Sequence, residues 1–566
     1  MHVKITTSGS RRYVQLVESY RDDAGRVKKR TVATLGRLDQ VGGELDSVIN
    51  GLLKVSGRDP LGAKPVPPSV AFESARALGD VWALTELWKE LGFGELRRIF
   101  RRTRHTTDVE ALIRVMVLNR LCDPDSKLGV LRWLETVALP EVDVTTITHQ
   151  QLLRSMDALM DHQAAVDAVV AGLLRPLIDQ DLSVVFYDLT TIRTEGLTTL
   201  TDDVREFGMA KEGIVARQFM LGVVQTADGL PIYHEVFAGN AAETKTLLPT
   251  LATVLERFPQ VRRLILVADR GLLSLDNLEA LQAIRLASGQ PLEFIIAVPG
   301  RRYHEFAELL GDFHRDHCAQ AEEEVTGELA WNGLRLIVAH DPATAAVQTQ
   351  RRNEHIDALI AQGEQWAGKL VDQDGGVKHR GRKLSDSGAK ARFYHAVCEA
   401  HLSKIIKVDL PAELFSYDID KTARALAEMM DGKLLLVTNA DALTPEDVVA
   451  RYKSLADIER GFKVLKSEIE IGPVYHRLPE RIRAHASICF MALILHRIIR
   501  SRLRAAGTGL SPERALEQLH RIQHHRIRLN DAEPVTGVSS ISTGQSELFS
   551  ALRVKKPVAP QQLTLL

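Results

Sequence analysis

Nearly continuous apolar runs, beginning at residue 182, are the feature that most constrains the fold. Such runs are expected of strands buried on both faces of a sheet. Two further strands, joined at Asp228-Gly229, carry the signal of a hairpin turn. Helices are predicted between the strands, so a mixed sheet with helices on its faces is expected. The predicted strands are 182–187, 216–225, 230–237, 263–268, 292–298 and 433–438, and the helices 243–257 and 275–288.

Two of the apolar runs are followed directly by an aspartate. Asp188 follows the run 182–187, and Asp269 follows the run 263–268. Polar residues just past the strand ends of such sheets collect at one edge, where ligands usually bind. Asp188 and Asp269 are therefore the first candidates for a functional site.

A third acidic candidate lies on a predicted helix that follows Thr444-Pro445-Glu446-Asp447. Tyr452, Glu459 and Lys466 are seven residues apart, which places them on one edge of a single helix. Glu459 would hold a cation, while Tyr452 and Lys466 would contact phosphate oxygens. The alternative is an amphipathic surface helix whose charges are only solvated. Its apolar stripe is Leu455, Ile458, Phe462 and Leu465.

Composition is that of a soluble globular protein. The 566 residues are 45% hydrophobic and 26% charged, with a net charge of -1 that neither indicates nor excludes nucleic acid. The four cysteines are far apart without a CxxC pair, which suits a reducing cytosol. The longest C-terminal apolar stretch, 488–494, is too short to span a bilayer. A cytoplasmic protein without a membrane partner is expected.

The chain is predicted to have several parts. A small β-hairpin module is expected at 1–57, and a Pro-rich linker follows it at 58–70. A helical, DNA-binding region is expected next, then a sheet in two parts with an inserted domain between them. The predicted boundaries are 72–178 for the helical region, 179–299 and 433–530 for the sheet, 300–432 for the insertion, and 531–566 for a loosely held tail.

Basic residues form three groups that could contact DNA. The cluster at 96–105 lies among short helices and is compatible with a helix-turn-helix, although any helical bundle can have a basic face. The glycine-containing segment 378–385 could contact phosphates or be a flexible loop. Charges at 476–485 could hold a DNA end or be solvated helix charges. The candidates are Arg97, Arg98, Arg101, Arg102, Lys378, Arg380, Arg382, Lys383, Lys463, His476, Arg477, Arg481, Arg483 and His485.

These stretches resemble the DDE transposases of bacterial insertion sequences, in the group with a Tyr-x2-Arg-x3-Glu-x6-Lys signature. Tyr452, Glu459 and Lys466 match that spacing, whereas Leu455 stands at the Arg position. The phosphate contact expected of that arginine would be absent, or Lys453 or Lys463 would supply it. Other matching segments are Tyr187-Asp188-Leu189-Thr190-Thr191, Ala268-Asp269-Arg270-Gly271, Tyr475-His476-Arg477 and the hairpin ending in Thr34-Leu35-Gly36, typical of a branch with an extra N-terminal module.

The resemblance implies an RNase H-like core that is split by the insertion and binds two Mg²⁺ ions, which Mn²⁺ could replace. Asp188 would bridge both ions, with Asp269 and Glu459 each completing one side. The implied partners are double-stranded transposon ends and target DNA, held by a homodimer. The implied location is the bacterial cytoplasm, with the nucleoid as the site of DNA-bound protein.

Three functions remain open from the sequence. The first is a transposase that binds terminal inverted repeats and catalyses cut-and-paste transposition. The second is an RNase H-like, structure-specific nuclease, which would need neither the insertion nor the Tyr and Lys beside Glu459. The third is a catalytically inactive DNA-binding derivative, which loss of an acidic ligand would mark; all three acids are present.

Overall fold

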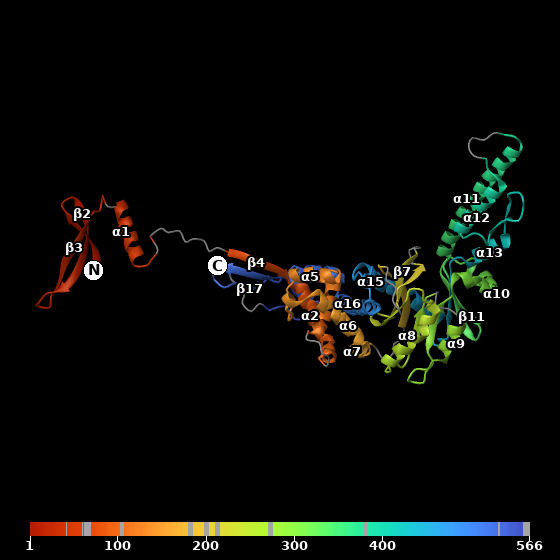
Figure 1. Cartoon of the computed structure of the whole chain (residues 1–566), viewed down its shortest axis with the longest axis horizontal. Coiled ribbons are helices and arrows are strands. Elements are labelled where there is room, and N and C mark those ends of the chain that lie inside the picture. Colours follow the sequence, from red (N-terminus) through yellow and green to blue (C-terminus); the bar gives the residue numbers. More distant parts are fainter. Residues whose placement is uncertain are drawn as a thin grey trace. The chain divides into compact units, whose positions relative to one another are not determined.

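The structure is a computed structural model of the whole chain (Figure 1). It describes all residues except 41, 59, 61–69, 102–106, 179–184, 197–202, 210–214, 270–274, 378–382, 530–531 and 559–566. The side chains of 42–45, 209, 243–244, 275–277 and 456–460 also lie outside the description. The predicted linker at 58–70 falls almost entirely on residues that are not described. The chain divides into two compact units, 1–73 with 527–535, and 74–526 with 536–566.

The first unit contains an antiparallel sheet of order β1-β2-β3, formed by β1 (His2–Ser8), β2 (Arg11–Arg21) and β3 (Val27–Arg37). The predicted hairpin is confirmed as β2 and β3, and its turn closes where the Gly25 N–H donates to the Asp22 carbonyl at 2.8 Å. Strand β1 adds to the hairpin, pairing Ile5 with Val14. Helix α1 (Gly42–Val55) follows.

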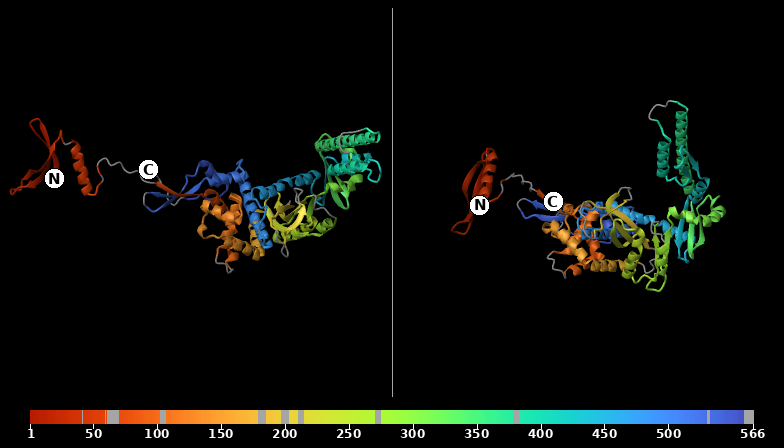
Figure 2. Two further views of the ribbon diagram at one scale, coloured as in Figure 1. Left: turned by 45° about the horizontal axis from the view of Figure 1, so that its top comes forward. Right: turned by 45° about the vertical axis from the view of Figure 1, so that its right-hand side comes forward.

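The second unit begins with helices that pack around the long helix α16 (Pro479–Ala505) (Figure 2). Helix α16 meets the length and hydropathy requirements of a membrane span, so the sequence estimate, which considered only 488–494, was too short. Because 94% of its apolar window is buried within the described protein, it is typical of a core helix. Helices α2 (Gly79–Glu90), α4 (Val109–Cys122) and α6 (His149–Asp161) contact α16. Helices α3 (Leu96–Phe100) and α5 (Lys127–Thr136) pack against α4, and α7 (Gln163–Leu174) packs against α6.

The predicted mixed sheet is confirmed. Within the described residues it has nine strands, ordered β11-β12-β15-β10-β9-β5-β7-β6, with β8 also paired to β7. Strands β5, β7 and β8 are antiparallel, whereas β9 and β10 run parallel to β5. The order β8-β7-β5-β9-β10 with these directions is the RNase H-like arrangement expected from the sequence. The bounds are β5 (Val185–Arg193), β6 (Glu206–Met209), β7 (Val215–Thr226), β8 (Pro231–Ala238), β9 (Ile265–Ala268) and β10 (Glu293–Ala297).

Part of the region between β10 and β15 (Lys433–Thr438) extends the same sheet. The insertion predicted at 300–432 contributes a hairpin to it, formed by β11 (Val325–Trp331) and β12 (Leu334–His340). Asn332 and Gly333 have positive φ angles of 48° and 73°, the conformation that joins two strands through a tight Asn-Gly turn. The sequence expectation overlooked this dipeptide.

The remainder of that region is mostly helical. Helices α11 (Pro342–Asp374) and α12 (Asp386–Glu399) lie side by side (Figure 1) and share a small core with the sheet of β13 (Ile406–Val408) and β14 (Tyr417–Ile419). Further helices are α8 (Glu243–Arg257), α9 (Leu275–Ala283), α10 (Ala307–Phe313) and α13 (Lys421–Met430). Helices α8 and α9 confirm the two helices predicted between the strands of the sheet.

The C-terminal residues are more ordered than predicted. A sheet of order β17-β16-β4 is formed by β4 (Val70–Ala77), β16 (Gln523–Leu529) and β17 (Val535–Val538). Helices α17 (Pro512–His520) and α18 (Thr543–Ala551) contact α16. Because Leu548, Phe549 and Leu552 are buried in the main core, the expectation of a loosely held tail is wrong for α18.

Candidate active site

The register of two parallel strands brings the two aspartates together. Strand β5 pairs with β9 up to Tyr187 opposite Ala268, and the next residue of each strand is Asp188 or Asp269. Neighbouring strands are about 4.8 Å apart, so the two residues occupy adjacent positions at this edge. Asp188 and Asp269 are both half-buried.

Asp188 does not lie past the end of its strand, as the sequence analysis expected. Strand β5 continues to Arg193 because its antiparallel partner β7 pairs with it over the whole length, with Asp188 opposite Val223. Only the pairing with β9 ends before Asp188. The Leu189 N–H donates to Asp188 Oδ1 at 2.7 Å, which orients this carboxylate.

Side chains alternate along β5, so Asp188 points to the same face as Phe186. Phe186 belongs to an apolar cluster with Ile265 and Val267 of β9, and Leu455 packs in the same cluster. Helix α14 (Pro445–Lys453) covers this face and begins where the Thr444 side chain accepts the Asp447 N–H, as predicted. The carboxylate of Asp188 therefore faces the side of the sheet on which α14 lies.

Tyr452 makes a direct contact with the second aspartate. Its hydroxyl donates to Asp269 Oδ1 at 3.1 Å, while its ring packs against the apolar cluster around Phe186. The prediction that Tyr452 and Glu459 share one helix is wrong, because α14 ends at Lys453 and α15 (Ala456–Ser467) begins at Ala456. The Leu455 N–H bonds the Tyr452 carbonyl, and this tighter turn separates the helices.

Glu459 lies in the first half of α15, and its side chain is outside the described residues. The helix backbone passes close to β7 at Gly461. A Cβ atom at Gly461 would be 2.8 Å from Nε2 of Gln225 and 3.0 Å from Nη2 of Arg497, so this glycine permits a close approach. Gln225 pairs with Phe186 of β5. Further along α15, Phe462 and Leu465 are buried, whereas Lys463 and Lys466 are exposed.

A basic cavity of about 510 Å³ lies between helices α4, α5, α6 and α16 and the segment 470–478, which follows α15. That segment supplies His476 and Arg477 from the predicted group, and the first turns of α16 supply Arg481 and His485. Three further basic residues, Arg120, Lys127 and His149, line the same cavity but were not selected from the sequence. Lys127 is only 5% exposed. The segment is tied to β5, since the Val474 N–H donates to the Arg193 carbonyl at 3.0 Å.

Positive charges in this cavity act on one another. Burial, followed by repulsion from Arg120, lowers the pKa of Lys127 to about 7. Burial, followed by repulsion from Lys127 and Arg481, lowers the pKa of His476 to about 3. Burial also lowers the pKa of His485, whose Nε2 lies 2.9 Å from the Ile471 carbonyl oxygen. An anion in the cavity would relieve this repulsion.

Several of the predicted DNA contacts have partners within the protein. Arg481 forms a two-pronged ion pair with Asp157 at 2.7 and 2.8 Å. Arg97 pairs with Asp108, and Arg98 with Glu95 at 2.6 Å. Arg483 is half-buried, and Arg101, Lys383 and Arg477 are exposed. Four predicted residues lie outside the described part of the chain: Arg102, Lys378, Arg380 and Arg382.

Two protein-family models match this chain. Residues 179–495 match the family model of the transposase DDE domain, which covers both halves of the sheet together with Asp188, Asp269 and Glu459. The chain belongs to the DDE transposases, enzymes that cut DNA and transfer strands and that depend on divalent metal ions. Residues 2–65 match the N-terminal domain of IS1634 family transposases, which covers the sheet β1-β2-β3.

Among solved structures, the chain is similar to the piggyBac transposase in a cryo-EM synaptic complex with hairpin DNA. The two are 11% identical with a TM-score of 0.36, over 78% of this chain and 77% of that chain. Comparison with curated proteins returns no match. The family matches confirm the prediction of an insertion-sequence transposase that acts in DNA recombination.

Proposed function

We propose that Asp188, Asp269 and Glu459 bind two Mg²⁺ ions, for which Mn²⁺ can substitute, and that this site cuts the ends of an insertion sequence and joins them to target DNA. The adjacent positions of Asp188 and Asp269, on the face of the sheet where α14 packs, are the observation that supports the proposal most. Carboxylate oxygens suit Mg²⁺, so the donor set fits the ion. Bound metal ions would activate the attacking oxygen and stabilise the leaving oxygen.

The residues around the carboxylates have positioning roles in this proposal. Tyr452, which was expected to contact phosphate, instead orients Asp269 through its hydroxyl. Glu459 enters from α15, whose exposed Lys463 and Lys466 are suited to contact phosphates of the cleaved strand.

Packing explains why a leucine, Leu455, stands at the arginine position of the family signature. Leu455 is buried in the apolar cluster of the sheet, so it makes no phosphate contact. Lys453 forms an ion pair with Glu324 at 2.5 Å. We therefore assign to Lys463 the phosphate contact that the family signature places on an arginine.

The basic cavity is proposed to hold the backbone of the transposon end. From Asp188 to Arg193, where the cavity segment joins β5, the strand extends roughly 17 Å. With one base pair per 3.4 Å, this length corresponds to about five base pairs of duplex. Lys127, Arg120 and Arg477 would therefore bind phosphates a few nucleotides from the cleaved bond.

Cut-and-paste transposition requires two ends to be held together, so we propose that the protein acts as a homodimer bound to two terminal inverted repeats. It would work in the bacterial cytoplasm, associated with the nucleoid when bound to DNA. Light scattering of the complex with end duplexes is expected to give two chains and two duplexes. A complex of one chain with one duplex, under conditions that support strand joining, would exclude this arrangement.

The test is cleavage of a labelled duplex that carries the ends of the element, in the presence of Mg²⁺ or Mn²⁺. Asp188→Asn, Asp269→Asn and Glu459→Gln are each expected to abolish cleavage while binding to the end duplex stays within about twofold. Glu279→Gln, on the exposed surface of α9, is the matched control and should cleave normally. Full cleavage by one of the three variants would remove that residue from the site. Binding without cleavage by the unaltered protein, even with Mn²⁺, would favour an inactive DNA-binding derivative.

A further inference from the structure

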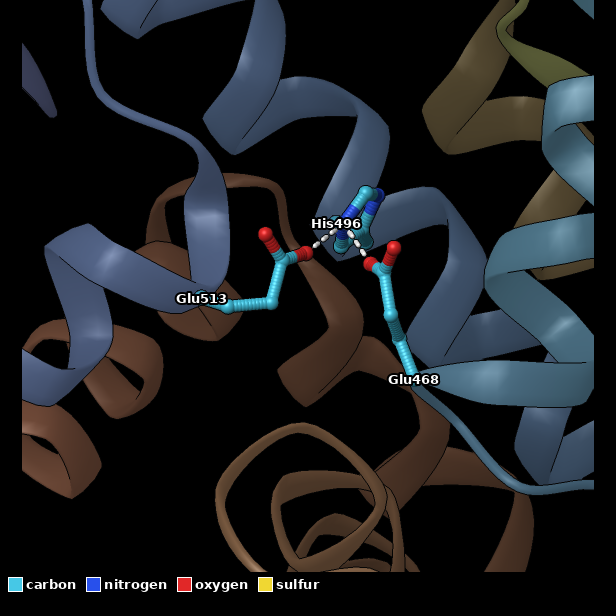
Figure 3. Close-up of side chains that lie close together, drawn as sticks. All are labelled: Glu468, His496 and Glu513. Carbon is cyan, nitrogen blue, oxygen red and sulfur yellow. Dashed lines mark hydrogen bonds and ion pairs between the residues drawn. The ribbon is translucent and has the colours of Figure 1, made fainter.

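A second group of metal-binding side chains lies at the far end of α15. Glu468 caps the C-terminus of α15, His496 lies in α16 and Glu513 is in the first turn of α17 (Figure 3). His496 Nε2 is 2.7 Å from Glu513 Oε1 and 3.0 Å from Glu468 Oε2. All three ligand atoms lie within 4.8 Å of one another. Three helices therefore direct one nitrogen and two oxygens to the same point.

Glu468, His496 and Glu513 together offer more hydrogen-bond acceptors than donors at the point where they meet. His496 is 4% exposed on its side chain, and its Nε2, which faces both carboxylates, carries at most one proton. Glu468 Oε2 is buried and lies 3.0 Å from the same Nε2, so the two carboxylates compete for one proton. Two carboxylates close together at a partly buried position repel each other unless a cation lies between them. A single proton on His496 offsets only one of the two negative charges of Glu468 and Glu513.

The surroundings leave room for an ion and a water molecule. The three side chains line a cavity of about 400 Å³, together with Cys122, Arg120 and the ion pair of His520 Nδ1 with Asp80 Oδ2 at 2.7 Å. Arg120 directs Nη1 to the carbonyls of Ile469 and Glu470 at 3.3 and 3.2 Å. These two carbonyls therefore accept hydrogen bonds from its Nη1.

We propose that Glu468, His496 and Glu513 form a binding site for one Zn²⁺ ion. An imidazole nitrogen with two carboxylate oxygens suits Zn²⁺, whereas Mg²⁺ prefers oxygen ligands alone. Three protein ligands leave the fourth tetrahedral position to water, for which the cavity has space. When Zn²⁺ binds, it replaces the proton on Nε2, and that proton passes to solvent.

This site is separate from the catalytic carboxylates. Glu468 is nine residues beyond Glu459 on α15, which corresponds to about 13 Å along a helix. The two ions of a two-metal site are only about 3.5–4 Å apart. A bound Zn²⁺ would instead connect the end of α15 to α16 and α17, and so hold the helix that carries Glu459. Binding of Zn²⁺ here does not depend on the proposed catalysis.

The test uses the untagged full-length protein with Asp188→Asn and Asp269→Asn, which removes two carboxylates of the catalytic site. After chelation and dialysis against Zn²⁺, about one equivalent per chain should remain. Co²⁺ in place of Zn²⁺ should give visible absorption bands of a site with nitrogen and oxygen ligands. Zn²⁺ is also expected to raise the Tm, because it binds the folded chain.

Glu513→Gln, in the same background, is expected to weaken Zn²⁺ binding by at least about tenfold and to remove the rise in Tm. Glu513 is partly exposed, so this substitution is compatible with folding. Glu547→Gln on the exposed surface of α18 is the matched control and should bind Zn²⁺ like the parent. Absence of Zn²⁺ and of the Co²⁺ bands in the parent, or unchanged binding by Glu513→Gln, would show that the group is an ion pair only.

Discussion

The contact between Tyr452 and Asp269 is the most specific interaction at the proposed active site. A hydroxyl that donates to one oxygen of a metal-binding carboxylate fixes its orientation, and loss of such partners typically lowers activity about 10–100-fold. Tyr452→Phe keeps the ring in its apolar cluster and removes only the donor.

We therefore expect Tyr452→Phe to reduce the cleavage rate about 10–100-fold and to raise the Mg²⁺ concentration needed for half-maximal cleavage. A titration of the cleavage rate with Mg²⁺ measures both. Tyr394→Phe, at an exposed position of α12, serves as the control and should leave both values unchanged. An unchanged rate for Tyr452→Phe would show that the hydroxyl has no positioning role.

The proposed contact of Lys127 with phosphate predicts that DNA binding depends on pH. The pKa of this lysine is lowered to about 7, first by burial and then by Arg120. Below that pH the ammonium group can bind phosphate, and above it the amine is neutral. Affinity for end DNA should therefore fall as the pH rises from about 6 to about 8, by at most about tenfold per pH unit for one proton. Arginine keeps its charge throughout this range, so Lys127→Arg should lose this part of the dependence. Equal pH profiles for both proteins would contradict this role for Lys127.

The lowered pKa of Lys127 affects folding stability in the opposite direction to DNA binding. The unfolded chain keeps the Lys127 proton up to about pH 10, whereas the folded protein loses it near pH 7. Between these values the unfolded state binds more protons, so this residue makes the free energy of unfolding of the DNA-free protein rise with pH. Denaturant unfolding at about pH 7 and pH 9 should show less of this rise in Lys127→Met.

At the scale of elements, the approach of α15 to β7 depends on Gly461. A Cβ there would meet Gln225 Nε2 at 2.8 Å, so Gly461→Ala should displace the helix that carries Glu459. We expect a loss of about 1–3 kcal/mol in the free energy of unfolding and a larger fall in cleavage than in DNA binding. Gly311→Ala in α10 has open space around its Cβ and should be neutral or slightly stabilising. Equal effects of both substitutions on unfolding would contradict the close packing at Gly461.

Elements with a simple pattern were predictable from the sequence, and those decided by tertiary packing were not. The strands β5, β9 and β10 are buried on both faces, so their apolar runs identify them. The break between α14 and α15 has no such signal, because Ser454 and Leu455 keep nearly helical φ and ψ angles. The position of Leu455 in the core of the sheet, which appears only in the fold, accompanies this break.

At the scale of the whole molecule, the proposed site combines segments that are far apart in the chain. Asp188 and Asp269 could be selected because each follows an apolar run, and the parallel pairing of β5 with β9 then makes them neighbours. The basic cavity could not be found in this way. Arg120 and Lys127 look like ordinary helix charges until α4, α5 and the segment after α15 come together.

Asp188 and Asp269 are proposed to bind the catalytic metal ions. Substitution of each by cysteine tests this binding directly, because a thiolate is a poor ligand for Mg²⁺ and a better one for softer metals such as Mn²⁺. The measurement is cleavage of the end duplex by Asp188→Cys and Asp269→Cys in each metal. We predict no cleavage in Mg²⁺ and partial recovery in Mn²⁺, beyond the change that Mn²⁺ causes in the unaltered protein. Full cleavage by either variant in Mg²⁺ would contradict the claim for that residue.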